Sequence, residues 1–138
     1  MSAVYCDTSA LYALLDRSDS NAASAAKLWE EFADEPTSLV TINYVVLEAV
    51  ALVQARLGME AVAALRSLVD PFVSVHYVDA ALHLAALEQV VSLSRRAVTL
   101  VDCASFAFMR QHGISRAFAF DRHFGEFGFH PVRTIGPT

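Results

Sequence analysis

The sequence has little of several residue types, and each scarcity excludes a class of protein. No apolar run reaches the roughly 20 residues that a membrane-spanning helix needs, and the N-terminal segment lacks the basic flank of a secretory signal. The two cysteines, Cys6 and Cys103, match no zinc or redox spacing. These absences predict a cytoplasmic chain without a membrane segment, in which both thiols are reduced and buried.

The composition is that of a globular chain, since 55% of the 138 residues are apolar and 18% are charged. This length predicts a single domain, residues 1–138, with a sizeable core. The formal net charge of −5 argues against a nucleic-acid partner unless several acids gather around divalent cations. The basic residues are nine arginines and one lysine, and arginine is the better ligand for phosphate. Charge therefore leaves a nucleic-acid partner open.

Short apolar segments alternate with longer helical ones along the chain. Residues 11–15 are expected to form the first turns of a helix, and Gly58 and Gly113 are placed to end two later helices. Strands separated by helices or helix pairs predict an α/β fold, with a short central parallel sheet in a three-layer α/β/α arrangement. Ligands of such sheets bind outside the carboxyl ends of the strands. The expected strands are residues 3–6, 38–41, 73–77, 117–120 and 132–135, and the longer helices are residues 22–33, 44–57, 60–69, 80–93 and 100–112.

Four carboxylates have neighbours that should have excluded a charge. Asp7 directly follows the first strand, and Asp121 follows the apolar segment A-F-A-F. Glu48 interrupts the apolar stretch Y-V-V-L-E-A-V-A-L-V, and Asp102 lies in T-L-V-D-C-A-S-F-A-F-M. The other acids mostly lie in polar surroundings, which is typical of solvated surfaces.

Each of the four acids has a structural alternative. Asp7 is placed to cap the helix that follows it, and Asp102 stands three residues after Thr99, the spacing of a capping box. Asp121 is placed to open a turn before Arg122. The alternative for Glu48 is a buried ion pair with an arginine.

Taken together, the four acids predict one shared site. Two of them at strand ends, one at a helix N-terminus and one on an apolar helix face can converge on a single edge of the sheet. Converging carboxylates repel one another unless a cation lies among them. All-oxygen ligands suit one or two Mg²⁺ or Mn²⁺ ions, which activate water and stabilise the leaving oxygen in phosphodiester cleavage. The pattern therefore indicates a metal-dependent nuclease.

Three hydroxyl groups stand close in sequence to these acids. Thr8, Ser9 and Ser105 are candidates to hydrogen-bond the metal ligands or a metal-bound water. Ser105 follows Asp102 by one helical turn and so shares its face. For Ser9, helix capping is the favoured role.

The order of motifs resembles a PIN domain, and within that family the VapC-type toxins of bacterial toxin–antitoxin pairs. The resemblance extends from residue 4 to residue 129 and rests on V-Y-C-D-T-S-A-L, T-I-N-Y-V-V-L-E, L-V-D-C-A-S-F-A and F-A-F-D-R-H-F. It implies a parallel sheet flanked by helices and Mg²⁺- or Mn²⁺-dependent endoribonuclease activity. The family's acidic quartet would fall on Asp7, Glu48, Asp102 and Asp121, which would be both catalytic and metal-binding. Thr8 or Ser9 would match the hydroxyl that follows the first acid.

The same resemblance implies partners. Toxins of this type form homodimers and are held inactive by a small cognate antitoxin. Members of the family cut tRNA, rRNA or mRNA, and the motifs do not distinguish these substrates. Candidate RNA contacts are led by Arg122, followed by Arg17, Arg95 and Arg96. His123 and Phe124 are expected to pack the loop that ends the last motif.

Other interpretations use the same residues differently. D-T-S-A also occurs at the active-site turn of aspartic proteases, but that fold is mostly strand. A phosphoryl-accepting receiver domain places an aspartate after a strand but needs a lysine across the site, whereas Lys27 lies in an early helix. A non-catalytic RNA-binding module of the same fold would not need four intact acids. A DNA flap nuclease would need additional helices to clamp DNA.

Overall fold

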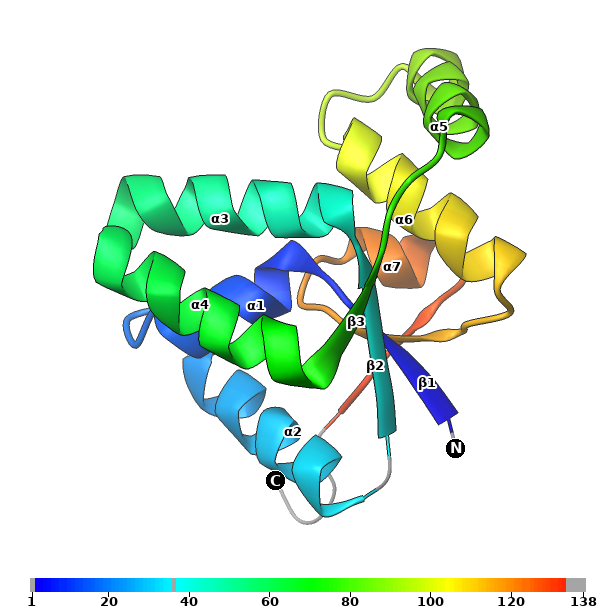
Figure 1. The fold of residues 1–138 in the computed structure, drawn as a ribbon. Coiled ribbons are helices and arrows are strands. Elements are labelled where there is room, and N and C mark those ends of the chain that lie inside the picture. The colour runs from blue at the N-terminus through cyan, green and yellow to red at the C-terminus, as the bar shows by residue number, and fades with distance from the viewer. Residues whose placement is uncertain (1, 36, 134–138) are drawn as a thin grey trace.

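The centre of the fold is a five-stranded parallel sheet (Figure 1). The computed structural model describes residues 2–35 and 37–133. Within these residues the strand order is β3-β2-β1-β4-β5, and every neighbouring pair is parallel. The predicted α/β class with a central parallel sheet is confirmed. The strands are β1 (Ser2–Cys6), β2 (Thr37–Ile42), β3 (Val73–His76), β4 (Arg116–Phe118) and β5 (His130–Pro131).

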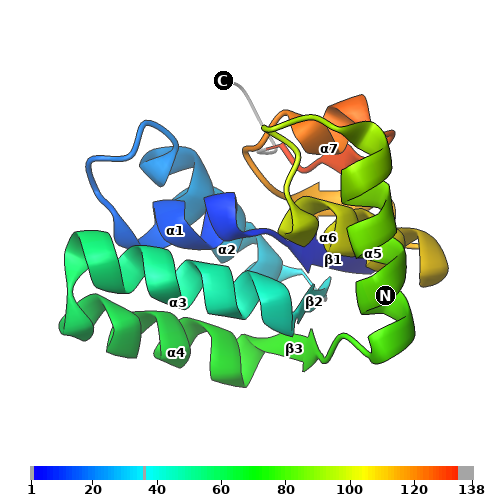
Figure 2. The same cartoon turned by 90° about the horizontal axis from the view of Figure 1, so that it is seen from above.

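Helices cover both faces of the sheet, as Figure 2 shows. One face carries α1 to α4, which connect β1 to β2 and β2 to β3, and the other face carries α5 to α7. This division follows from the right-handed crossover between parallel strands, because the chain moves toward β3 first and then returns toward β5. The helices are α1 (Thr8–Leu15), α2 (Ala22–Asp34), α3 (Asn43–Leu57), α4 (Met59–Phe72), α5 (Ala80–Leu93), α6 (Leu100–Gln111) and α7 (His123–Glu126).

The prediction was least accurate near the C-terminus. A last strand was expected at residues 132–135, but β5 is His130–Pro131, and residues 134 and 135 lie outside the described part. Proline lacks an N–H donor, so it weakened the strand signal there, although the edge position of β5 tolerates it. The single-turn helix α7 was not expected, because four residues are too few to show a helical period.

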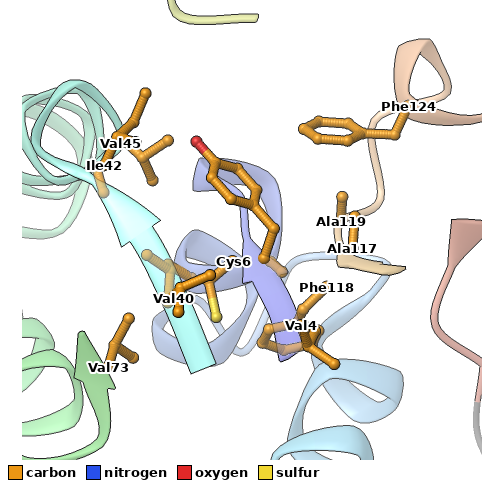
Figure 3. Packing of buried hydrophobic residues seen from close by; sticks show 14 of the residues in the cluster. Val4, Cys6, Val40, Ile42, Val45, Val73, Ala117, Phe118, Ala119 and Phe124 are labelled. Carbon is orange, nitrogen blue, oxygen red and sulfur yellow. The ribbon is translucent and has the colours of Figure 1, made fainter. Parts of the chain in front are cut away.

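Apolar side chains pack against the sheet from both sides, which explains why its strands are continuous apolar segments. Val4, Val40, Val73 and Phe118 lie together in the buried cluster (Figure 3). On the α2 side, Phe118 packs edge-on against Phe32 with 5.2 Å between ring centroids. Both cysteines are buried and free, as expected. No helix in the described ranges is long and apolar enough to cross a membrane.

The chain leaves β1 toward β2 and leaves β4 toward β5, so the connections diverge between β1 and β4. In parallel sheets, ligands bind outside the carboxyl ends of the strands at such a point. β1 pairs with β4 up to Cys6 and Phe118. The next backbone group, the N–H of Asp7, donates to the carbonyl of Phe118 at 3.0 Å. The residues that follow the two strands therefore leave the sheet side by side, and both strands are followed by acids of the predicted set.

Candidate active site

Asp7 occupies the junction between β1 and α1, and the residue is 4% exposed. Its carboxylate accepts from the backbone N–H of Ser9 at 3.2 Å and from the Ser9 hydroxyl at 2.7 Å. The pKa of Asp7 is raised to about 7, chiefly by burial. The two Ser9 hydrogen bonds lower it, and the nearby carboxylates of Asp102 and Asp121 add to the rise. The expected helix cap is therefore present, and the same carboxylate interacts electrostatically with two other members of the predicted quartet.

Ser9 connects the two strand ends. Its hydroxyl donates to Asp7 and accepts from the backbone N–H of Phe120 at 2.9 Å. This bridge holds the carboxylate that follows β1 in a defined position relative to the segment that follows β4. The expectation that Ser9 mainly caps the helix was wrong, because Asp7 is the cap and Ser9 supports the acid.

Asp102 lies in the first turn of α6 and is 7% exposed. One carboxylate oxygen accepts from the Thr99 N–H at 3.0 Å, and the Thr99 hydroxyl accepts from the Asp102 N–H at 3.1 Å, which completes the predicted capping box. Burial raises the pKa of Asp102, the Thr99 N–H opposes that effect, and Asp121 adds to it. The capping box and the shared site are thus compatible functions of one residue.

Asp121 and His123 complete this cluster. An oxygen of Asp121 accepts from the His123 N–H at 2.8 Å, so the predicted turn is also present. The ring atom Nδ1 of His123 lies 2.9 Å from Asp121 Oδ1 and 3.8 Å from Asp102 Oδ2. One ligand atom from each of the three residues falls within 4.8 Å of the others. The structure therefore brings a histidine into the acidic site.

Sequence reasoning had given His123 only a packing role. The His123 side chain is 7% exposed. Neither ring nitrogen has a hydrogen-bond partner among the described residues, because the contact with Asp121 lacks hydrogen-bond alignment. The signal that could have indicated its position is the D-x-H spacing, which places the two side chains on one turn. Phe124 does pack as expected, edge-on against Phe106 at 5.1 Å between centroids.

Glu48 is the fourth acid of the quartet, and no hydrogen bond or ion pair of the described residues links it to the other three. It lies in the second turn of α3, a helix that starts at the carboxyl end of β2, and its side chain is half-buried. Within the described ranges it makes no hydrogen bond and no ion pair, so the alternative of a buried arginine pair was wrong. The half-buried carboxylate of Glu48 is therefore available to solvent or to a ligand.

The two other hydroxyls have structural roles. Ser105 is fully buried and accepts a 2.6 Å hydrogen bond from the Tyr5 hydroxyl, which joins α6 to β1. The Thr8 hydroxyl faces the carbonyl of Val45 at 3.5 Å, on α3. Both groups position the elements that carry the acids, and neither hydrogen-bonds an acid.

The electrostatics of the cluster favour a bound cation. Two buried carboxylates with raised pKa values lie close to a third, and in the described part of the chain no lysine or arginine forms an ion pair with any of them. Carboxylate oxygens with a nearby imidazole nitrogen suit a divalent ion such as Mn²⁺ or Mg²⁺, and the carboxylate majority favours these over softer metals. The donor set therefore fits the metal chemistry that the sequence predicted.

Comparison with known proteins identifies the family. The PIN domain model matches residues 4–130. Two sequences described as 23S rRNA-specific endonuclease VapC20, from two strains of Mycobacterium tuberculosis, are 37% identical over 131 residues, which are 94% of this chain and 98% of theirs. A crystal structure of Mycobacterium tuberculosis VapC20, described as a sarcin–ricin loop cleaving toxin, superposes with a TM-score of 0.84 at 35% identity and covers 94% of this chain and 98% of that one. The chain therefore belongs to the PIN-domain family, and its relatives within that family are of the VapC type.

Proposed function

We propose that this chain is a metal-dependent endoribonuclease that acts as the toxin of a toxin–antitoxin pair, with Asp7, Glu48, Asp102 and Asp121 as its catalytic and metal-binding acids. The observation that carries the proposal is the burial of Asp7 and Asp102 beside Asp121 without a compensating arginine or lysine in the described residues. Such an arrangement is unfavourable in the isolated protein and favourable when a cation is present. The half-buried, unpaired carboxylate of Glu48 is the fourth ligand in this proposal.

The chain's own residues provide a preorganised set of acids. When bound, one or two Mg²⁺ or Mn²⁺ ions supply water activation and stabilise the charge that develops at the scissile phosphate. Hydrogen bonds from Ser9 hold Asp7, and the Thr99 N–H holds Asp102. The N–H of His123 fixes the direction of the Asp121 carboxylate. Each carboxylate keeps a second oxygen, or further lone pairs, that these hydrogen bonds do not use.

The proposed substrate is ribosomal RNA, because the similar VapC20 proteins are described as 23S rRNA-specific. Among the arginines considered from the sequence, Arg122 stands beside Asp121, is exposed and forms no ion pair with a described residue. Arg95 is a weaker candidate, because its guanidinium pairs with Glu126 at 3.0 Å and lies over the ring of Phe127. Arg122 is therefore the first arginine to test for RNA contact.

The proposed partners follow from the toxin assignment. A free ribonuclease in the cytoplasm damages its host, so we propose a small antitoxin that blocks the acidic crevice and a homodimeric toxin. An arginine of the antitoxin is a suitable ligand for the cluster, since guanidinium pairs bidentately with carboxylates. Expression of the chain alone should arrest growth, and coexpression of the neighbouring gene should relieve the arrest. Harmless expression of the intact chain at a high level would contradict the toxin assignment.

The decisive experiment for the enzyme is cleavage of a hairpin RNA with the sarcin–ricin loop sequence, measured with Mn²⁺, Mg²⁺ or a chelator. Cleavage should require the ion, and Glu48→Gln should lower it by more than about 100-fold, because even second-shell groups of metal sites are worth 10- to 100-fold. The matched control is Glu88→Gln on the exposed side of α5, which should cleave like the wild type. Cleavage that continues unchanged in the chelator would disprove the metal mechanism.

A further inference from the structure

A cavity of about 450 Å³ adjoins the acidic cluster. It lies between α2 and the carboxyl ends of β4 and β5, and Asp121 is part of its wall. Its size is within the range of roughly 300 to 1,000 Å³ that is typical of small-molecule sites. The remaining lining residues are Ser24, Leu28, Ala119, Phe120, Arg122, Pro131, Val132 and Arg133.

The lining combines an apolar interior with two guanidinium groups. Leu28, Ala119 and Val132 provide apolar surface, while Arg122 and Arg133 are exposed and have no ion pair within the described residues. Among the described lining residues Asp121 is the one carboxylate, so this part of the lining is net positive in a chain whose formal charge is −5. An apolar cavity with cations at its edge fits a flat aromatic group that carries a phosphate.

Phe120 gives this cavity an aromatic wall at a defined distance from the catalytic acids. Its ring packs edge-on against Phe118, with 6.2 Å between centroids, and its backbone N–H is held by the Ser9 hydroxyl that also binds Asp7. A group stacked on Phe120 would have a fixed position relative to Asp7, through the Ser9 hydroxyl, and relative to Asp121, which is the next residue in the chain. Unpaired RNA bases are commonly recognised by stacking on such rings and on arginine planes.

We propose that this cavity binds one unpaired nucleobase of the RNA substrate, next to the scissile phosphate, with Arg122 and Arg133 holding the adjacent backbone phosphates. The assignment rests on the proposed ribonuclease function and adds to it a site that selects an RNA in which a base can be turned outward. It also explains why the cavity opens beside Asp121 rather than on the opposite face of the sheet, since the base and the reacting phosphate belong to neighbouring nucleotides.

The main test compares hairpin RNAs of the sarcin–ricin loop that each lack one base of the loop. For the wild type, one abasic position should lower kcat/KM by about 10- to 100-fold, the usual value of one base–aromatic stack. Ser24→Trp, which fills the cavity, should lower kcat/KM on the intact hairpin by a similar factor and remove the sensitivity to that abasic position. The matched control is Ala26→Trp on the same helix, which is exposed and outside the cavity and should behave as the wild type.

A second variant keeps the proposal testable if Ser24→Trp folds poorly. Arg133→Ala should raise KM with kcat retained and reduce the salt dependence of log KM by about one charge, as expected for one lost phosphate contact. Arg66→Ala, on the exposed face of α4, is the charge-matched control and should leave both unchanged. An abasic series without a sensitive position would overturn the proposal and would favour insertion of an antitoxin side chain instead.

Failure of the proposed function would be recognised separately. If the wild type cleaves no RNA, the four nucleoside 5′-monophosphates are titrated while the methyl signals of Leu28 and Ala119 are followed by NMR. Shifts confined to these methyl groups, and absent in Ser24→Trp, would support the base site without a nuclease. Unchanged signals would overturn it.

Discussion

The aspartate on α4 and the aspartates at the carboxyl edge of the sheet lie in opposite environments, one exposed and paired, the others largely buried and close together. Asp70 on α4 pairs with Arg66 one helical turn earlier, at 2.8 Å, and the two side chains are 59% and 82% exposed. Asp7, Asp102 and Asp121 lie at the carboxyl edge of the sheet, where burial and mutual repulsion raise the pKa values of the first two. An exposed aspartate paired with an arginine costs the fold little, whereas neighbouring buried carboxylates repel one another unless a cation lies among them. The proposed site therefore lies where buried carboxylates repel one another, and Asp70 shows the ordinary exposed alternative.

The largest expected effect comes from Asp7→Asn. We expect RNA cleavage to be lost, since Asp7 is one of the proposed metal ligands, while the asparagine oxygen still accepts from Ser9. In the metal-free wild type the folded pKa of Asp7, about 7, exceeds that of the unfolded chain, so the folded state binds the proton more tightly. The Asp7 contribution to the free energy of unfolding is therefore largest below about pH 4 and falls as the pH rises to about 7.

Thermal melts of the wild type and Asp7→Asn over a pH series without metal measure the direction of this pH dependence. The wild type should lose a few kcal/mol relative to Asp7→Asn between pH 4 and pH 8, because one pKa unit corresponds to about 1.4 kcal/mol. Saturating Mn²⁺ should reduce the difference, since the ion favours the ionised acid. Parallel pH profiles for the two proteins would mean that Asp7 ionises as an ordinary surface group.

An intermediate effect is expected for Asp121→Asn. Two unit charges ~5 Å apart repel by about 3 kcal/mol at an effective dielectric constant of ~20, so neutralising one should relieve repulsion. The variant should melt at or above the wild-type temperature without metal, because its side-chain oxygen can still accept from the His123 N–H. It should nevertheless be inactive.

Melts with added Mn²⁺ show whether Asp121 belongs to a metal site or only stabilises a turn. The wild type should gain about 2.7 kcal/mol when free metal is a hundredfold above its dissociation constant, and Asp121→Asn should gain less. A destabilised variant beside a wild type that is indifferent to Mn²⁺ would remove the physical basis of the assignment.

The smallest effect is expected for Asp70→Asn, which makes the same chemical change in the other environment. Exposed ion pairs contribute little to stability because water screens them, so the melting temperature of the variant should fall only slightly, if at all. Its activity and its response to Mn²⁺ should match the wild type in the same melts and cleavage assays. A gain in stability as large as that of Asp121→Asn would show that net charge, rather than the local cluster, controls both results.

The structural alternatives for the acids proved to be compatible with the shared site. Asp7 caps α1, Asp102 completes a capping box and Asp121 opens a turn. Asp102 and Asp121 nevertheless cluster with His123, and both carboxylates raise the pKa of Asp7. From the sequence, a cap and a site member look like competing roles for one residue. They are compatible because a carboxylate has two oxygens and several lone pairs, so a hydrogen bond that fixes its position leaves acceptors for another ligand.

Several features of this protein were determined by local sequence. Apolar strands followed by helices specify a parallel sheet with two covered faces, and an acid directly after a strand must emerge at its carboxyl edge. These rules sufficed for the fold class and for the side of the sheet on which Asp7 and Asp121 lie. Only tertiary structure placed His123 between two acids, engaged Ser105 with Tyr5 and opened a cavity beside Phe120. Those features depend on which strands are neighbours, and the order β3-β2-β1-β4-β5 results from packing between segments that are far apart in the chain.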